Sequence, residues 1–197
     1  MTRHQKHPQI NRDWREFIEL LNSNGVDYLI TGAWCVAFHA EPRATGDLDI
    51  IIRRTPETAA KMEKIMREFG FITEPQLTEN DFLTPNMVFQ LGYKPNRIDL
   101  LTDCLPVQFE AAWTKRHEIS VNGLSMKFLD RDSLIECKQA AARPKDLADI
   151  ELLQRTRPID KMPEGQFERP KKQSPPPKPE ISDVPEPEHD DGFDFEW

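Results

Sequence analysis

Three aspartates occupy positions from which their carboxylates could act together. Asp47 and Asp49 are two residues apart in a segment whose isoleucine-rich part, 48–52, reads as a strand, so both side chains leave the same face. Asp99 is alone in the apolar segment 98–101, which reads as another strand. If the two strands lie side by side, the three carboxylates form the oxygen-rich ligand set that Mg²⁺ prefers. Two such ions can hold the attacking and leaving oxygens of a phosphoryl displacement.

A glycine between a strand and a helix adds a second chemical element. Segment 27–31 reads as a short buried strand, Gly32 ends it, and 33–39 is apolar enough for a helix. Backbone N–H groups at such a junction point toward an anion, and the helix dipole favours negative charge there. Because Gly32 has no side chain, a phosphate can approach closely. A triphosphate bound there, with its metals on the aspartates, is set up for nucleotidyl transfer.

The three aspartates also have simpler interpretations. Asp47 and Asp49 could mark an ordinary solvated strand entry. Asp99 could be a buried aspartate paired with Arg97 or with a backbone donor. Asp103 is a rival third carboxylate on the same alternation, but it lies past the apolar strand, so Asp99 is preferred.

Alternating helical and strand patterns predict an α/β domain that positions these residues. Apolar residues at helical spacing begin near Arg12 and stop before Gly25, and Pro56 opens a second amphipathic helix. Asn122-Gly123 is the strongest hairpin dipeptide in the chain. The expected elements are helix 12–24, strand 27–31, helix 33–39, strand 48–52, helix 56–69, strands 88–91 and 97–101, a hairpin of 120–121 and 126–129, and helices 132–143 and 145–154 broken at Pro144.

Length and charge exclude several classes of protein. The chain has 197 residues and a formal net charge of -8, which argues against a nucleic-acid coat protein with a large basic surface. No apolar run comes near the ~20 residues that span a bilayer, and the N-terminus has no apolar signal-peptide core. The 3 cysteines are widely spaced and form neither a disulfide framework nor a zinc pattern. We therefore expect a soluble cytoplasmic protein without membrane contact.

Composition divides the chain into a body and a tail. Residues 158–197 hold 9 of the 17 prolines and are strongly acidic, so they bury too little surface to offset their ordering entropy. We expect a flexible N-terminus over 1–11, a domain over 12–157 whose helical C-terminal part is 131–157, and a disordered Pro-rich acidic tail over 158–197. The tail ends at 189–197 with three aromatics in an acidic string, which is either a solubilising end or a short motif for a protein partner.

The pattern of Gly32-Ala33, a gap, Asp47-Leu-Asp49 and a later lone Asp99 resembles the signature of the nucleotidyltransferase (polymerase-beta-like) superfamily. The wider stretch from Gly25 to Ile50 is similar to small bacterial members, including abortive-infection-type toxins and aminoglycoside nucleotidyltransferases. The likeness continues through 97–101 and from Lys138 to Ile150, covers about residues 14–155, and does not reach the tail. It implies a mixed sheet with flanking helices and a small helical C-terminal part.

The resemblance also implies roles for individual residues. Ala33 departs from the family, which usually has glycine or serine there, so backbone contacts to phosphate remain but a hydroxyl contact is lost. The implied roles are metal binding by Asp47, Asp49 and Asp99 (two Mg²⁺ ions, or Mn²⁺), activation of the attacking hydroxyl by Asp99, triphosphate contacts by Gly32 and Ala33, steadying of the phosphates or the metal loop by Arg43 and Thr45, and a phosphate contact by Lys138.

Several other residues have competing interpretations. Lys138 could lie on a solvated helix face instead of binding phosphate, and Asp146 and Asp149 most simply form surface pairs. Trp34 is either a core residue or a platform on which a base stacks, and His39 is expected to be an ordinary packed or exposed histidine.

The expected function is metal-dependent transfer of a nucleoside monophosphate from an NTP, such as ATP, to an acceptor hydroxyl. The acceptor could be RNA (for example a tRNA end), a protein or a small molecule. The biological setting could be a toxin–antitoxin pair or another defence system. The alternative is a catalytically inactive module with the same fold that binds partners through its acidic aromatic tail.

Overall fold

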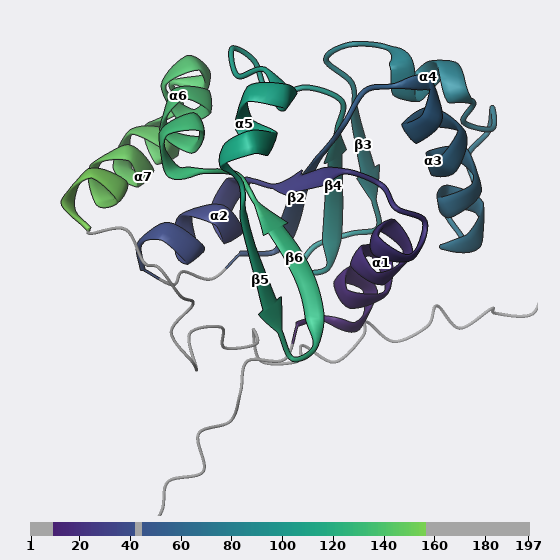
Figure 1. Ribbon diagram of the computed structural model, residues 1–197, viewed down its shortest axis with the longest axis horizontal. Helices are drawn as coiled ribbons and strands as arrows, with labels where there is room; N and C mark the ends of the chain where they lie inside the picture. Colours follow the sequence, from purple (N-terminus) through teal and green to yellow (C-terminus); the bar gives the residue numbers. More distant parts are fainter. Residues whose placement is uncertain (1–9, 42–44, 157–197) are drawn as a thin grey trace, which may run out of the picture.

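The computed structural model describes residues 10–41 and 45–156 (Figure 1). Six strands form one mixed sheet in the order β3-β4-β2-β1-β6-β5, and helices flank it, which confirms the predicted α/β class. The strands are β1 (Tyr28–Ile30), β2 (Asp47–Ile52), β3 (Val88–Leu91), β4 (Arg97–Leu101), β5 (His117–Val121) and β6 (Leu124–Phe128). The helices are α1 (Arg12–Ser23), α2 (Gly32–His39), α3 (Pro56–Glu68), α4 (Glu79–Leu83), α5 (Phe109–Lys115), α6 (Arg131–Ala141) and α7 (Pro144–Arg155).

Strand β2 lies near the middle of the sheet and connects the two halves of the fold. It pairs antiparallel with β1 and parallel with β4. The hairpins β3–β4 and β5–β6 form the two edges, and β6 runs parallel to β1. The two segments that carry the three aspartates therefore lie side by side, which meets the condition set above for their carboxylates to converge.

The two faces of β2 differ in burial. Leu48, Ile50 and Ile52 are buried on one face, where they anchor the strand in the core. Asp47 and Asp49 lie on the other face and are only partly buried. The strand thus presents its acidic residues where a ligand can reach them, at its N-terminal end.

Amphipathic helices supply much of the core. Helix α1 begins after Asn11, whose side chain accepts a hydrogen bond from the backbone N–H of Asp13. In Figure 1, α2, α6 and α7 lie together toward the left of the sheet, and α3 and α4 lie at the right. The helical side chains buried in the core include Trp14, Phe17, Ile18 and Leu21 of α1 and Met62, Ile65 and Met66 of α3.

The predicted elements agree with the structure within a few residues at most boundaries, but two short helices were missed. Helix α4 has 5 residues and depends on a capping box between Thr78 and Asp81, and α5 has 7 residues, of which only Ala112 is buried. Neither carries enough apolar periodicity to stand out. Strand β5 begins at His117, earlier than expected, because it is an edge strand whose first two residues, His117 and Glu118, are polar and exposed.

The terminal predictions fall partly outside the described residues. Of the N-terminal segment 1–11, only Ile10 and Asn11 are described, and Asn11 caps α1. The tail 158–197 lies wholly outside the described residues. Within 10–41 and 45–156, no helix combines the length and apolarity needed to cross a membrane.

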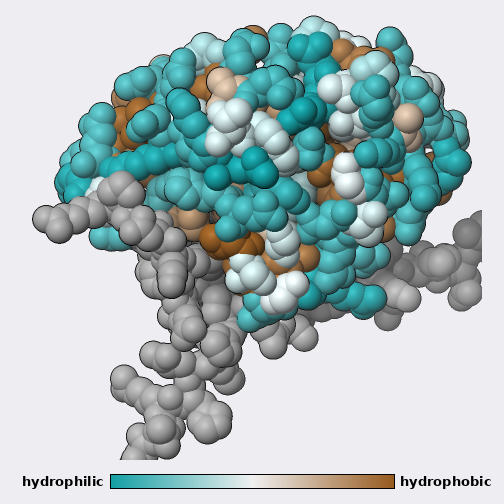
Figure 2. All heavy atoms as spheres, viewed as in Figure 1, coloured by the Kyte–Doolittle hydropathy of each residue, from teal (hydrophilic) through white to brown (hydrophobic). Residues whose placement is uncertain are grey.

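The surface of the described body is mainly polar. Figure 2 shows hydrophilic residues over most of the visible face, with hydrophobic residues in small patches between them. The large hydrophobic residues that are exposed come from separate elements and include Ile72, Val88, Tyr93, Leu105 and Leu147.

Candidate active site

Four charged residues meet on one face of the sheet because of the register between β2 and β4. Asp47 lies opposite Arg97, and Asp49 lies opposite Asp99. Side chains two residues apart on a strand share a face, and neighbouring strands are only about 4.8 Å apart. The pairing therefore gathers three carboxylates and one guanidinium, which we call the acidic cluster (Asp47, Asp49, Arg97 and Asp99).

Arg97 joins two of these carboxylates. Its Nη2 lies 2.6 Å from Asp99 Oδ2 and 3.1 Å from Asp47 Oδ2. The pairing of Asp99 with Arg97, weighed above as the simpler interpretation, is thus present. The other oxygen, Asp99 Oδ1, is buried and has no hydrogen-bond partner among residues 10–41 and 45–156. One oxygen of this carboxylate is therefore paired with the guanidinium, and the other oxygen makes no hydrogen bond within the described residues.

Asp47 is stabilised as an anion by its neighbours. The Thr45 hydroxyl donates a hydrogen bond of 2.8 Å to Asp47 Oδ1, and Lys94 Nζ lies 3.2 Å from Oδ2. Burial acts to raise the pKa of Asp47, but Thr45, Lys94 and Arg97 outweigh it and the pKa is lowered overall. Asp47 is therefore charged under ordinary conditions.

Asp49 is buried more deeply and lies against Gly32. Burial, reinforced by the charges of Asp47 and Asp99, raises the pKa of Asp49 to about 6. A Cβ at Gly32 would overlap the Asp49 carboxylate, and the φ of Gly32 is +62°, in the left-handed region. The Thr31 N–H donates to the Asp49 carbonyl at 2.9 Å, which fixes the end of β1 beside β2. Only glycine therefore fits at this first position of α2, next to the Asp49 carboxylate.

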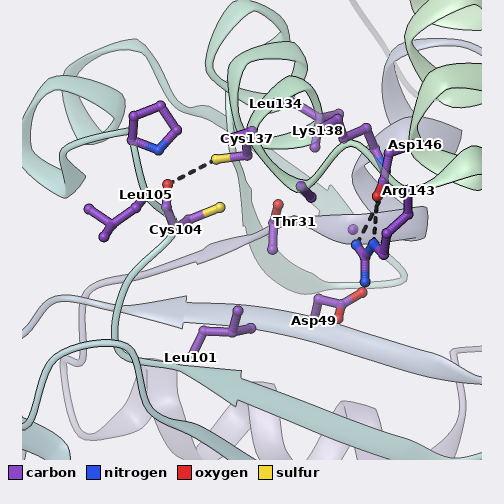
Figure 3. Close-up of a pocket in the computed structure, with 14 residues that line it drawn as sticks. Thr31, Asp49, Leu101, Cys104, Leu105, Leu134, Cys137, Lys138, Arg143 and Asp146 are labelled. Atoms are coloured by element: carbon purple, nitrogen blue, oxygen red, sulfur yellow. Dashed lines mark hydrogen bonds and ion pairs between the residues drawn. The ribbon is translucent and has the colours of Figure 1, made fainter.

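A cavity of about 570 Å³ opens beside Asp49 and Gly32. Figure 3 shows that the Asp49 carboxylate and the Arg143 guanidinium face each other at one end of this cavity. Apolar and sulfur-containing side chains line the other end. The cavity therefore has a charged end next to the acidic cluster and a less polar end formed by residues that include Leu101, Cys104, Leu105, Pro106, Leu134 and Cys137.

Lys138 lines the same cavity, but its ammonium is already occupied. Its Nζ lies 2.7 Å from Asp149 Oδ2 and 3.2 Å from Asp146 Oδ1, and all three residues are buried. Arg143 makes two further hydrogen bonds to Asp146, of 2.6 and 3.3 Å. The predicted solvated position of Lys138 and the surface pairs of Asp146 and Asp149 are therefore wrong. Opposite charges on α6 and α7 neutralise each other when the two helices pack, which allows them to be buried.

The remaining candidates lie close to the acidic cluster or outside it. Ala33 follows Gly32 in the first turn of α2. Trp34 is buried and packs edge-on against Trp14 with ring centroids 5.4 Å apart, so it is a core residue. His39 is also packed inside, and its Nε2 lies 2.8 Å from the Leu129 carbonyl oxygen.

Asp103 does not join the acidic cluster. Asp103 accepts hydrogen bonds from Arg54 and from the Asn86 N–H, so the rival third carboxylate has partners elsewhere. Arg43, predicted to steady the phosphates or the metal loop, lies outside the described residues, and so does the aromatic end of the tail, 189–197.

The donor atoms of the cluster fit a hard divalent cation. Carboxylate oxygens are the ligands that Mg²⁺ and Mn²⁺ prefer, and the orphaned Asp99 Oδ1 is one such oxygen. As they stand, however, no three or more His, Cys, Asp or Glu side chains in 10–41 and 45–156 are grouped to hold a metal ion. Arg97 contacts Asp47 and Asp99 instead. Sequence reasoning named Arg97 only as a possible partner of Asp99, because its spacing places it on the same face as Asp99 and only the register between β2 and β4 brings it to Asp47.

Comparisons with known proteins bear on the fold. No family model matches the sequence, and no curated protein matches it. Among solved structures, the lincosamide antibiotic adenylyltransferase LnuA with lincomycin bound is similar at 14% identity and a TM-score of 0.50, over 76% of this chain and 99% of that chain. The antibiotic-resistance factor ANT(2'')-Ia has 14% identity and a TM-score of 0.46, over 72% of this chain and 80% of that chain. An antigenic nucleotidyltransferase-like protein from Paracoccidioides brasiliensis has 14% identity and a TM-score of 0.43, over 71% and 72%.

Proposed function

We propose that this protein, which has the nucleotidyltransferase fold, transfers a nucleoside monophosphate from an NTP to an acceptor hydroxyl and releases pyrophosphate. One observation carries the proposal. The register of β2 and β4 sets Asp49 beside Asp99, and the same Asp49 carboxylate packs against Gly32 at the N-terminus of α2. Carboxylates for a cation and backbone N–H groups for an anion therefore meet beside one cavity.

In this proposal, Asp47, Asp49 and Asp99 hold the divalent metal, either Mg²⁺ or Mn²⁺, with two ions expected. When bound, the metal supplies positive charge to the phosphate oxygens and lowers the barrier by electrostatic stabilisation. The chain's own contribution is to hold the carboxylates at fixed spacing on two paired strands. Thr45 supports this arrangement through its hydrogen bond to Asp47.

The cavity next to Asp49 is the proposed binding site for the nucleotide. The N–H groups of Gly32 and Ala33 would bind the phosphates, and Arg143, which faces the Asp49 carboxylate in the cavity (Figure 3), would add positive charge. Arg43 stays a predicted phosphate contact. Lys138 would act on the phosphates through its charge rather than by direct contact, since its ammonium donates hydrogen bonds to Asp146 and Asp149. The apolar end of the cavity is suited to a base.

The proposed chemistry is a single displacement at phosphorus. The acceptor hydroxyl oxygen forms a bond to the α-phosphorus, and the bond between that phosphorus and the pyrophosphate oxygen breaks. The proton of the hydroxyl passes to a carboxylate, for which Asp99 is suited because its Oδ1 has no hydrogen bond within the described part of the chain.

The acceptor class is a finer part of the proposal. RNA, a protein hydroxyl and a small molecule are the candidates, and we place the small molecule first. LnuA is a lincosamide antibiotic adenylyltransferase with lincomycin bound, so a chain of this fold acts on a small molecule. A role in a toxin–antitoxin pair or in defence would show as toxicity on expression that disappears in Asp49→Ala.

A labelling experiment tests the activity and the acceptor together. Each of the four α-labelled NTPs is incubated with the protein and Mg²⁺. One acceptor fraction is added to each reaction: cellular RNA, cellular protein or a small-molecule extract. Wild type is compared with Asp47→Ala/Asp49→Ala and with Asp103→Ala, a control aspartate that lies outside the acidic cluster. Label should enter one fraction with wild type and Asp103→Ala only. No label with any nucleotide or with Mn²⁺ would refute the transferase and favour the inactive binding module.

A further inference from the structure

We propose that Arg97 is an internal counter-ion that holds the acidic cluster together without metal and competes with a divalent cation for the same carboxylate oxygens. In this role Arg97 is a positioning residue, because it acts through Asp47 and Asp99. The inference rests on the proposed function in one respect, namely that the acidic cluster binds a metal.

The geometry of Arg97 supports this role. A single nitrogen, Nη2, lies within hydrogen-bond distance of one oxygen from each of two strands, Asp47 Oδ2 on β2 and Asp99 Oδ2 on β4. The side chains of Arg97, Asp47 and Asp99 are 22%, 20% and 11% exposed. Charge-assisted hydrogen bonds at such partly buried positions are stronger than those between surface ions.

The cluster needs a cation, and Arg97 is the best-placed one. Three carboxylates on one face repel each other unless positive charge is near. Lys94 also contacts Asp47, but its side chain is 62% exposed, so water and salt screen that pair. Arg97 alone contacts two of the aspartates in the part of the chain that the structure describes.

The same contacts oppose metal binding. A divalent cation ligated by Asp47 and Asp99 would be drawn to the oxygens that Arg97 holds. Asp99 Oδ1 is buried and has no hydrogen-bond partner within the described residues, so Arg97 does not compete for that oxygen. Metal binding must therefore displace the guanidinium from at least part of its position. Consequently the affinity for metal should be set by a competition, and removing Arg97 should strengthen it.

The test measures Mn²⁺ binding by calorimetry and by electron paramagnetic resonance, without nucleotide, on the full chain. Arg97→Gln removes the charge and should bind Mn²⁺ about tenfold more tightly than wild type, the size expected when one charge-assisted hydrogen bond no longer competes. Its melting temperature without metal should be lower than that of wild type, and added Mn²⁺ should raise it further than in wild type. Arg97→Lys keeps the charge and should bind with an affinity between the two, which serves as the readout if the glutamine variant does not fold.

Arg54→Gln is the matched control, because Arg54 also pairs with a strand-end aspartate, Asp103, away from the cluster. It should leave the affinity for Mn²⁺ unchanged. If wild type binds Mn²⁺, Asp49→Asn abolishes binding, and Arg97→Gln binds equally or more weakly, the competition is overturned while the proposed function stands. If wild type binds no Mn²⁺ with or without NTP, both fail.

Discussion

Replacing Lys138 by methionine should destabilise the protein strongly. Lys138 projects from α6 between Asp146 and Asp149 of α7, and the three side chains are only 8%, 1% and 5% exposed. Methionine keeps much of the length and apolar volume of the lysine stem but removes the ammonium. Two carboxylates then lose a buried positive partner.

The structure sets the size of the effect. Breaking a buried ion pair by removing one partner costs about 3–5 kcal/mol, because the remaining charge is left in a poorly solvated site. Asp146 keeps its two hydrogen bonds from Arg143, and Asp149 loses its contact of 2.7 Å with the ammonium. We therefore expect the free energy of unfolding to fall by about 3 kcal/mol, the lower end of that range.

Urea unfolding at pH 7 measures this quantity directly, with Lys115→Met as an exposed control that should change stability little. The double variant Lys138→Met/Asp149→Asn should recover part of the loss, since a neutral amide replaces a buried carboxylate that has lost the Lys138 charge. A loss below about 1 kcal/mol would refute the argument, because it would mean that water still solvates these charges. Reduced NTP affinity with nearly unchanged stability would instead make Lys138 a phosphate ligand.

Two further predictions concern other buried positions. Gly32→Ala should abolish transfer as completely as Asp49→Asn, since the new methyl group overlaps the Asp49 carboxylate. Urea unfolding should show a greater loss of stability than for the control Gly123→Ala, where φ is also positive but the space is open. A stability loss no greater than that of Gly123→Ala would contradict the close contact. Burial lowers the pKa of His39 to about 4, so unfolded chains take up this proton near pH 6.5 and folded ones only near 4. The free energy of unfolding should therefore fall by up to about 3 kcal/mol more in wild type than in His39→Gln as the pH drops through this window. An equal fall in the two proteins, measured by urea unfolding at several pH values, would contradict this prediction.

Local patterns in the sequence predicted most of the fold. Strands such as 97–101 have apolar residues two positions apart, and helices such as 56–69 have them three to four positions apart. Glycine or proline lies near the ends of these segments. The pairing of Asp49 with Asp99 could also be anticipated, because a lone aspartate in an apolar strand has few other places to lie. These features depend on near neighbours in the chain, so a single sequence contains them.

Contacts between charged residues on different elements could not be predicted in the same way. Lys138 appears on a helix with ordinary charged neighbours, and only the packing of α6 on α7 brings Asp146 and Asp149 around it. A lysine is buried when its partners are buried with it, and those partners come from tertiary structure. The bridging of two strands by Arg97 was missed for the same reason.

The acidic cluster lowers the stability of the folded protein. Asp49 is the clearest case, because its deep position beside Gly32 raises its pKa to about 6, so that keeping it charged at neutral pH costs folding energy. Two features compensate within the described structure: strand pairing fixes the carboxylates, and Arg97 neutralises part of their charge. A sheet with no cation to bind would gain stability by replacing Asp49 with an apolar residue. The three aspartates around one arginine are the arrangement that the proposed exchange of an internal cation for an external one requires.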